Sequence, residues 1–379
     1  LMLVEALAEA ADWSQARAAI ESVNGLLDSV EDPSAAVRAR AETLYWTLKV
    51  TTRQNDAKGA SEAARRAQQL SNRALEDSAI DTNARVNAVL SYASYAAFYE
   101  SSERAMSLLD DVRDLVELAD PEIAERARLV RGTVAIRMAR WDEGEYEFSE
   151  ALRHASKRND LVQQAGLWNN LACSALEQGD WSRFSEWAGK VEDVRVCDTL
   201  DTLLLLTLNR ANALFYQGRA QAAVSLYGKA LETVDATGSA EFRPEILSCQ
   251  GLIALQLGDT TEVGRVWRDI LGTTPSQLLG TQELFKYEWF RAFMGKNLGL
   301  DGTPERLLAA AREQSKLDVL SHYKLMWLGS ILFGDTFATL AGRQARDSRR
   351  DLFDNRLGWF AGFAQRWARA AAAKSGSAI

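Results

Sequence analysis

The fold is decided by the stretch that begins Trp168-Asn-Asn-Leu171-Ala172-Cys-Ser-Ala175-Leu-Glu-Gln-Gly179-Asp180-Trp181 and ends at Ile270. Its apolar and small residues recur at intervals of three and four, which places them on one face of a helix. The Gly-Asp pair then interrupts the helix, and a second helical run begins at the tryptophan. The segment therefore predicts two helices joined by a sharp turn.

The glycine of this turn recurs with a nearly fixed period. Gly179, Gly218 and Gly258 are 39 and 40 residues apart. Counting back 40 residues from Gly179 reaches Ala139, and a tryptophan stands two residues after each of these two positions. A hairpin that recurs at a period of this length indicates a helical repeat array.

The repeated unit resembles the tetratricopeptide repeat, which has Trp-x2-Leu-Gly-x2-Tyr in its first helix and Gly, Ala-x3-Phe and Ala further on. The matching residues are Trp168, Leu171, Ala172, Gly179, Gly218, Ala223, Tyr227 and Ala230. Ala175 and Leu214 replace the usual tyrosine, and no proline closes these units. The resemblance implies that small residues at 172, 211 and 251 let the two helices of a hairpin approach closely. It also implies that an aromatic residue at 227 or 267 fills the gap to the next hairpin.

The same rhythm extends, less regularly, over the rest of the chain. Residues 1–120 and 272–379 read as divergent repeats that flank the well-phased repeats of 121–271, and a helix from Leu352 to about Ala372 would cap the end. Only five prolines occur, which favours helix almost everywhere. We therefore predict an all-α fold: one right-handed α-solenoid of about eight antiparallel helix hairpins over residues 1–379, with a C-terminal capping helix.

Composition and charge exclude several functions. No run of 18 apolar residues occurs, so no membrane span is predicted. A net charge of −8 argues against direct contact of this region with nucleic acid. Three cysteines without paired spacing favour a reducing, cytoplasmic setting. The chain opens in a helical pattern without an initial methionine, which leaves two possibilities open: a piece of a longer protein, or a true start at Met2.

The sequence carries no catalytic or cofactor motif. Only two histidines occur, His154 and His322, and no metal-ligand spacing, phosphate loop or nucleophile elbow is present. We therefore expect no cofactor, no metal and no enzymatic activity. Cys173 would need a cationic neighbour to become a reactive thiol, and an inert small side chain is the favoured interpretation.

The expected binding surface is a concave groove, because superhelical stacking of such hairpins puts the first helix of each one on the inside. The candidates are the first-helix positions that face inward. They are Arg126, Thr133, Arg137, Asn169, Asn170, Cys173, Glu177, Asn209, Asn212, Tyr216 and Gln256.

The four asparagines among these candidates need a reason, because asparagine is unfavourable inside helices. They could bond the backbone of an extended peptide. Alternatively, Asn170, Asn209 and Asn212 bond neighbouring helices and fix the stack, which we favour. Some tetratricopeptide modules clamp a terminal carboxylate with two asparagines and two basic residues. Asn170 and Asn212 match the asparagines of such clamps, but Ser248 and Leu252 stand where the basic residues are expected, which argues against a clamp.

These patterns favour a non-catalytic scaffold that binds a peptide, a partner protein or a small effector in the groove. The repeat length and number resemble the C-terminal sensor repeats of maltose-activator-like bacterial regulators, which implies the sensor region of a signalling or transcription regulator. One alternative is a structural adaptor that self-associates through the aromatic-rich region 285–333, although aromatics at helical spacing favour core packing. Another is a peptide-controlled regulator, such as a phosphatase with repeats of this type. The N-terminal third has no histidine, which argues against the phosphatase.

Overall fold

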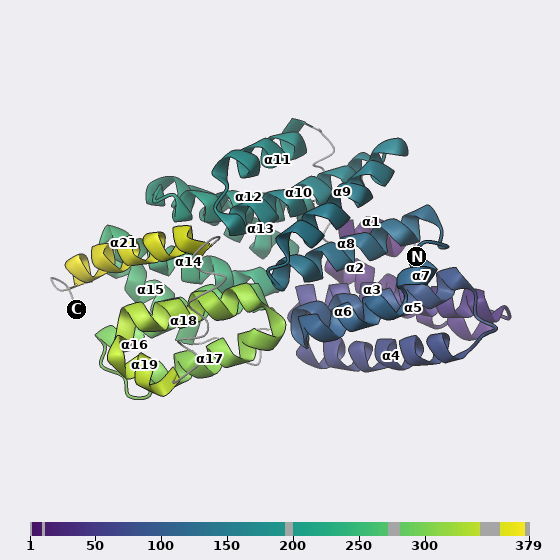
Figure 1. Ribbon diagram of the computed structural model, residues 1–379, viewed down its shortest axis with the longest axis horizontal. Coiled ribbons are helices and arrows are strands. Elements are labelled where there is room, and N and C mark those ends of the chain that lie inside the picture. Colours follow the sequence, from purple (N-terminus) through teal and green to yellow (C-terminus); the bar gives the residue numbers. More distant parts are fainter. Residues whose placement is uncertain (1, 10–11, 194–199, 272–280, 342–356, 376–379) are drawn as a thin grey trace. The chain divides into compact units, whose positions relative to one another are not determined.

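The computed structural model of the chain describes residues 2–9, 12–193, 200–271, 281–341 and 357–375. Every regular element in these ranges is a helix, as predicted (Figure 1). None of the described helices is both long and apolar enough to cross a bilayer. The α-helices in chain order are α1 (Met2–Glu9), α2 (Trp13–Asn24), α3 (Pro33–Arg53), α4 (Ala57–Glu76), α5 (Thr82–Tyr99), α6 (Ser102–Asp111), α7 (Arg113–Val116), α8 (Pro121–Arg137), α9 (Trp141–Lys157), α10 (Leu161–Gln178), α11 (Trp181–Asp193), α12 (Leu200–Tyr216), α13 (Ala220–Thr237), α14 (Arg243–Leu257), α15 (Thr260–Leu271), α16 (Thr281–Asn297), α17 (Thr303–Leu317), α18 (Val319–Phe333), α19 (Asp335–Ala341) and α21 (Gly358–Ser375).

The chain divides into two compact units, which are described separately. Unit 1 consists of Leu1–Leu171, Trp187–Leu203 and Asp235–Glu241. Unit 2 consists of Ala172–Glu186, Leu204–Val234 and Phe242–Ile379.

Successive helices form antiparallel pairs, and the described ranges hold nine of them, from α1–α2 to α18–α19 (Figure 1). This number is close to the eight predicted. The first helices of neighbouring pairs also contact one another: α3 contacts α5, α5 contacts α8, α14 contacts α16, and α16 contacts α18. These two kinds of contact confirm the helical-repeat fold that the 40-residue period predicts.

The turn glycines adopt the left-handed backbone conformation that the pattern requires. Gly179, Gly218 and Gly258 have φ angles of 71°, 79° and 78°. Each ends the first helix of a pair, where a residue with a side chain would be strained. Gly299, with φ 64°, lies 41 residues after Gly258 and continues the series. The period therefore extends past residue 271, where the sequence pattern loses its register.

Ala139 lies where the period calls for a glycine, and it has a φ of 59°. A Cβ atom in this conformation crowds the following carbonyl oxygen and costs roughly 1–2 kcal/mol. Ala139→Gly is therefore expected to stabilise the protein by about 0.5–1 kcal/mol, after the extra freedom of glycine in the unfolded chain is subtracted. Urea unfolding followed by circular dichroism should show a higher midpoint.

The matched control for this change is Ala124→Gly, which lies inside α8 with helical backbone. It should lower the free energy of unfolding by about 1 kcal/mol. A midpoint that falls in both variants would show that residue 139 carries no left-handed strain.

Aspartate side chains begin the second helix of several pairs. The carboxylates of Asp56, Asp180 and Asp259 each accept a hydrogen bond from the backbone N–H three residues later, at 2.8, 3.0 and 3.0 Å. Each bond satisfies an N–H that has no partner within its own helix. Each Gly-Asp pair in the sequence therefore marks the end of the first helix, followed directly by the residue that caps the N-terminus of the second.

The close-packing glycines act between different helices. A Cβ atom at Gly132 would lie 2.6 Å from the Phe148 ring, so this glycine lets the two helices of one pair approach, α8 and α9. A Cβ atom at Gly251 would lie 2.6 Å from the ring of Phe290, which belongs to α16 in the next pair. The prediction that residue 251 serves its own hairpin is therefore wrong. Trp267 contacts the same phenylalanine with ring centroids 6.0 Å apart, which confirms its predicted place between hairpins.

The core of unit 1 forms where first helices meet their partners. Its largest cluster joins apolar side chains of α3 to α8, and a smaller one gathers around Trp13 at the N-terminal end. The indole N–H of Trp13 donates a 2.9 Å hydrogen bond to the hydroxyl of Ser239, and Arg53 pairs with Glu241. The segment that follows α13 is thereby fixed to unit 1.

The core of unit 2 is rich in aromatic residues. Phe285, Tyr287, Trp289, Phe290 and Phe293 of α16 are all buried. These five aromatic residues therefore form core, as their helical spacing favours. Burial of each of these large side chains stabilises the unit by about 1.5–3 kcal/mol.

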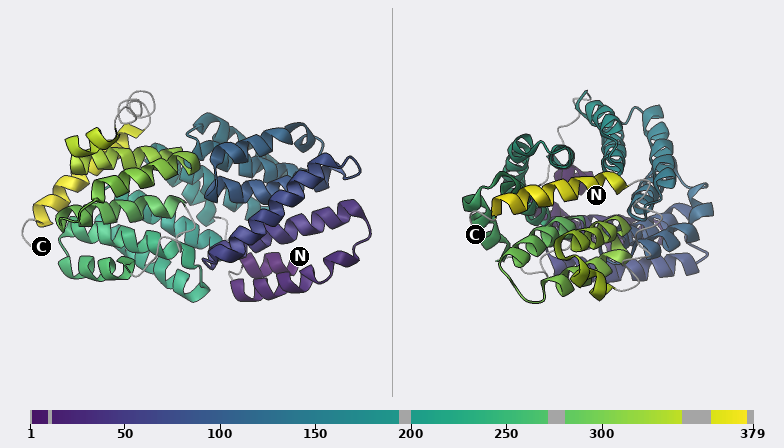
Figure 2. Two further views of the ribbon diagram at one scale, coloured as in Figure 1. Left: turned by 90° about the horizontal axis from the view of Figure 1, so that it is seen from below. Right: turned by 60° about the vertical axis from the view of Figure 1, so that its left-hand side comes forward.

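The last helix, α21, packs against the middle of unit 2 (Figure 2). Its start at Gly358 is later than the predicted one, and residues 352–356 lie outside the described ranges. It was expected to cover the end of the array. It does cover apolar surface, but this surface belongs mainly to α12, α14, α16 and α18 and to the end of α10.

Candidate functional site

Three first helices of unit 2 meet in a buried polar network. The ammonium of Lys286 on α16 pairs with the carboxylate of Glu245 on α14 and donates a 2.6 Å hydrogen bond to the side-chain oxygen of Asn212 on α12. The hydroxyl of Tyr227 also donates to Asn212. The amide of Asn212 donates a 3.4 Å bond to Glu245. Asn212 therefore fixes the helix stack, as the favoured interpretation predicts.

The charge of Lys286 depends on this network. Burial disfavours the charged ammonium, but the Glu245 carboxylate outweighs it, so the pKa of Lys286 is raised above its ordinary value. Lys286 is 5 % exposed and Glu245 is 7 % exposed, which excludes solvent as a substitute partner. Each charge of the pair therefore requires the other, because either one alone would be buried without an opposite charge beside it.

A second ion pair lies nearby and involves a predicted groove residue. Lys324 of α18 pairs with Glu177 of α10. The ammonium of Lys324 also lies 5.4 Å from the centre of the Phe285 ring and 5.6 Å from that of Phe360. Burial alone would lower the pKa of Lys324, but Glu177 outweighs it and the pKa is raised.

Helix α21 covers this part of unit 2 with its apolar face. The buried residues of that face follow helical spacing, at Phe360, Phe363, Ala364, Trp367 and Ala371. We call the surface beneath it the first-helix face of unit 2. It is defined by residues that contact α21, namely Glu177, Gly179, Phe215, Tyr216, Leu252, Leu257, Phe285, Trp289 and Phe293.

The contacts of α21 advance from one first helix to the next. Phe363 packs on Phe215 of α12, with ring centroids 5.0 Å apart. Trp367 packs on Trp289 of α16 at 4.8 Å, and its indole N–H donates a 2.9 Å bond to the carbonyl of Leu252 on α14. One helix therefore lies across several successive repeats, which is how a ligand would lie on a repeat array.

Backbone carbonyls near the ends of the first helices accept hydrogen bonds from α21. The Trp359 indole N–H donates to the carbonyl of Glu177 at 3.2 Å, and the Lys374 ammonium donates to that of Leu257 at 3.1 Å. Such carbonyls have no acceptor role within their own helix, and helix dipoles favour cations beside them. The face therefore selects for N–H donors and a positive charge.

The turn at Gly179 is shaped to receive Trp359. A Cβ atom on Gly179 would lie 2.4 Å from the indole ring, so only glycine fits beneath it. Gly218 has the same backbone conformation, but nothing lies within 4 Å of the position of its Cβ atom.

The groove candidates on unit 1 are bound to neighbouring first helices. Arg126 of α8 pairs with Glu42 of α3 at 2.7 Å and also donates to Asn87 of α5. Arg137 is 2 % exposed and lies with its guanidinium 4.6 Å from the centre of the Phe98 ring. Both arginines are therefore part of the packing between first helices.

The other candidates differ in exposure. Asn169 is buried, whereas Asn170 and Asn209 are half-buried. The Thr133 hydroxyl donates to the carbonyl of Leu129 at 3.0 Å. The side-chain oxygen of Gln256 is buried and has no hydrogen-bond partner among the described residues.

Tyr216 and Cys173 have strongly shifted acidity. Tyr216 is buried beneath Phe363, with ring centroids 5.3 Å apart, and burial raises its pKa to about 12. Burial, with a smaller effect from Glu177, also raises the pKa of the Cys173 thiol to about 12. The thiolate is therefore suppressed near neutral pH, which supports the interpretation of Cys173 as an inert side chain.

Sequence reasoning missed the two lysines and Glu245. Glu245 and Lys286 are 41 residues apart, so they hold equivalent positions in successive repeats. Opposite charges at equivalent positions of successive repeats are the signal that could have identified the pair. A basic residue that contacts Asn212 is thus present. It is Lys286, which lies two helix pairs further along the chain, whereas a carboxylate clamp would place it one pair further.

Comparisons with known proteins give likenesses in structure only. No protein-family model and no curated protein matches the sequence. A Rap protein in complex with Competence and Sporulation Factor superposes with a TM-score of 0.58 at 14% identity, over 91% of this chain and 99% of that one. NprR in complex with its cognate peptide NprX superposes with a TM-score of 0.55 at 14% identity, over 89% of this chain and 98% of that one. The chain therefore has the all-α, tetratricopeptide-like helical-repeat fold of these proteins.

Proposed function

We propose that the protein is a non-catalytic receptor for a helical peptide or partner segment, which it binds on the first-helix face of unit 2. The observation that carries this proposal is α21 itself. A helix of the chain already lies across successive first helices, held by buried aromatic rings and by indole N–H groups that reach backbone carbonyls. We infer that α21 acts as an internal ligand, which an external helix replaces.

The chemistry of the face specifies the ligand. It must be an amphipathic helix, because the face receives the rings of Trp359, Phe363 and Trp367, which follow one another at intervals of about one helical turn. At least one indole or other N–H donor must reach the carbonyls at the ends of first helices. A basic residue near its C-terminal end would take the place of Lys374.

Competition with α21 sets the affinity of the first-helix face for an external helix. A tethered helix acts at an effective concentration on the order of millimolar, so an external helix of equal quality binds weakly. Each 1.4 kcal/mol by which α21 is loosened improves external binding about tenfold. The partner must therefore fit better than α21, or α21 must first be loosened.

The wider biological role belongs to the same proposal. The two solved structures that share this fold are complexes, one of Rap with Competence and Sporulation Factor and one of NprR with the peptide NprX. This supports a peptide-receiving part of a bacterial signalling or transcription regulator, located in the cytoplasm. The narrower relation to maltose-activator-like regulators has repeat length and number as its only support. The open reading frame upstream of Leu1 would test it.

The absence of catalysis is also a proposal, and the environments of the reactive side chains support it. Burial lowers the pKa of His322, whose ring nitrogen Nδ1 lies 2.6 Å from the carbonyl oxygen of Ala311. His154 lies on the other unit, and Cys173 is held as the thiol. A nucleophile paired with a base would need these groups within hydrogen-bond distance of each other.

A fluorescent peptide of residues 357–375 tests the proposal on the full-length chain. Gly179→Ala places a Cβ atom in the Trp359 ring and should loosen the first turn of α21. A version of the peptide with alanine in place of the residue equivalent to Trp359 does not meet this Cβ atom, so the variant should bind it about tenfold more tightly than wild type does. Gly218→Ala has the same left-handed strain without that contact and should bind like wild type.

Fluorescence anisotropy measures both affinities. A peptide in which serine replaces the residues equivalent to Phe363 and Trp367 should not bind. Equal affinity of the two glycine variants, or no binding by either, would refute the proposal.

A further inference from the structure

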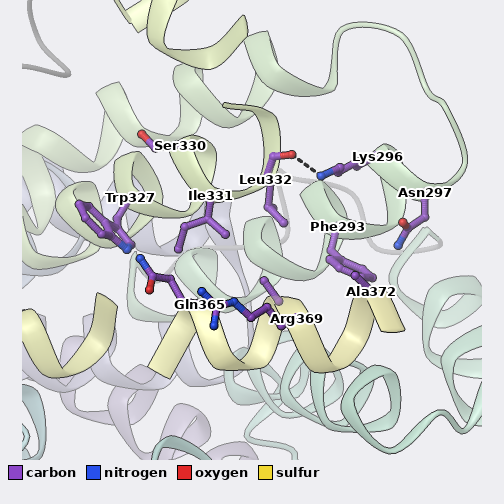
Figure 3. Close-up of a pocket in the computed structure, with 11 residues that line it drawn as sticks. Phe293, Lys296, Asn297, Trp327, Ser330, Ile331, Leu332, Gln365, Arg369 and Ala372 are labelled. Atoms are coloured by element: carbon purple, nitrogen blue, oxygen red, sulfur yellow. Dashed lines mark hydrogen bonds between the residues drawn. The ribbon is translucent and has the colours of Figure 1, made fainter. Parts of the chain in front are cut away.

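We propose that a cavity between α16, α18 and α21 binds a small carboxylate that carries an apolar body. The cavity has a volume of about 580 Å³ and lies within unit 2 (Figure 3). This is within the range of roughly 300–1,000 Å³ that is typical of small-molecule sites. It adjoins the first-helix face and shares Phe293 with it, but the residues of α21 that line the cavity lie outside the helix's buried face.

The charge of the cavity wall selects an anion. Lys296 of α16 and Arg369 of α21 both line it, and none of the described residues that line it is acidic. Lys296 donates one hydrogen bond to the carbonyl of Leu332, which fixes the ammonium at the cavity and leaves two of its three donors (Figure 3). Among the residues that the structure describes, no carboxylate pairs with Arg369. Its planar fork matches the two oxygens of a carboxylate.

The other residues that line the cavity favour a ligand with an apolar body. Phe293, Trp327 and Ile331 offer a ring surface and an aliphatic side chain. Asn297 and Gln365 add amide groups that can bond to a peptide unit or a hydroxyl. Figure 3 shows Gln365 and Arg369 projecting from α21 towards the residues of α18. An uncharged apolar molecule would leave the cations unused, and an inorganic anion would leave the apolar wall uncovered.

Binding at this cavity has a consequence for α21. A ligand that contacts Arg369 and Trp327 together joins α21 to α18, and so it favours the seated helix. Its effect is the opposite of that of a helix competing for the first-helix face. The carboxylate proposal does not depend on the proposed function, since a ligand can bind here whether or not any helix replaces α21.

The carboxylate can come from a free acid or from the C-terminus of a peptide. Isothermal titration calorimetry on the full-length chain should compare N-acetyl-phenylalanine, N-acetyl-leucyl-phenylalanine and the amide of each. We expect the acids to bind about tenfold more tightly than their amides, because an ionised acceptor forms the stronger hydrogen bonds to the cations. The better of the two acids identifies the source: the longer one indicates a peptide terminus, and the shorter one a free acid.

Two arginines on α21 provide the matched variants. Arg369→Gln should lower the affinity for the acids about tenfold and leave that for the amides unchanged. Arg366→Gln, on the same helix but outside the cavity, should behave like wild type. Hydrogen exchange of the α21 amides should slow when an acid is bound. Equal binding of acid and amide, no binding at millimolar concentration, or full affinity in Arg369→Gln would overturn the proposal.

Discussion

Trp367→Ala is expected to release α21 from unit 2, at a cost of about 3–5 kcal/mol. Trp367 is 1 % exposed, and its ring centroid lies 4.8 Å from that of Trp289 and 5.1 Å from that of Phe293. The change also leaves the Leu252 carbonyl without its 2.9 Å hydrogen bond from the indole. Amide hydrogen exchange within residues 359–373 should therefore speed up by about two to three and a half orders of magnitude, since 1.4 kcal/mol corresponds to a factor of ten.

The same variant should gain affinity for the external 357–375 peptide. The gain should be about 100-fold, because the internal competitor has lost most of its binding energy. Arg366→Ala, on the exposed side of α21, is the control and should change neither quantity. Fast exchange in α21 without any gain in peptide affinity would mean that the uncovered face does not accept a helix.

Lys286→Met should be the most destabilising single change in the polar network, at about 3–5 kcal/mol. It leaves the buried carboxylate of Glu245 without its cation and removes a donor to Asn212. Replacing both partners, as Lys286→Met with Glu245→Leu, should recover much of the loss, because no uncompensated charge remains. Urea unfolding midpoints of the single and double variants, treated as a double-mutant cycle, give the coupling between the two residues.

The pH dependence of this effect has a defined sign. The pKa of Lys286 is raised in the folded protein, so its contribution is complete below the unfolded-state pKa of about 10.4 and declines above it. The stability difference between wild type and Lys286→Met should stay constant from neutral pH to about 10, and then shrink. A difference that fades below pH 9 would show that the lysine is not held by Glu245.

The repeat fold could be predicted because its causes are local in sequence. Helical spacing, left-handed glycines and aspartate caps recur every 40 residues, and each acts within a few residues of itself. The period even located Ala139, which adopts the left-handed conformation without being glycine. The sequence pattern loses its register after 271, although Gly299 continues the series in its backbone conformation.

The candidate groove was predicted less completely, for two reasons. Asn169, Asn212 and Arg137 are predicted to face the groove, but all three are buried, so substituting them together would damage packing rather than test binding. The interpretation of Asn212 as a helix-to-helix link is confirmed by its bonds to Tyr227 and Lys286. Glu245 and Lys286 were missed because they are 41 residues apart, and nothing local in the sequence pairs the two charges.

The position of α21 could not be derived from its own sequence. Helical periodicity shows which residues of an amphipathic helix are buried, but not the surface that buries them. Trp359, Phe363 and Trp367 fit an end cap as well as they fit the first-helix face. Contacts that join residues more than 100 positions apart, such as Trp367 with Leu252, decide between these arrangements.

Hydrogen exchange of the wild-type chain, resolved by peptide fragments, tests most directly whether α21 is a replaceable occupant. If it is, α21 opens by itself, so residues 359–373 exchange faster than α14 and α16, which stay protected beneath it. Gly179→Ala should widen this gap and Gly218→Ala should not. Identical protection of α21, α14 and α16 in all three chains would contradict the account, because the last helix would then be a permanent part of the core.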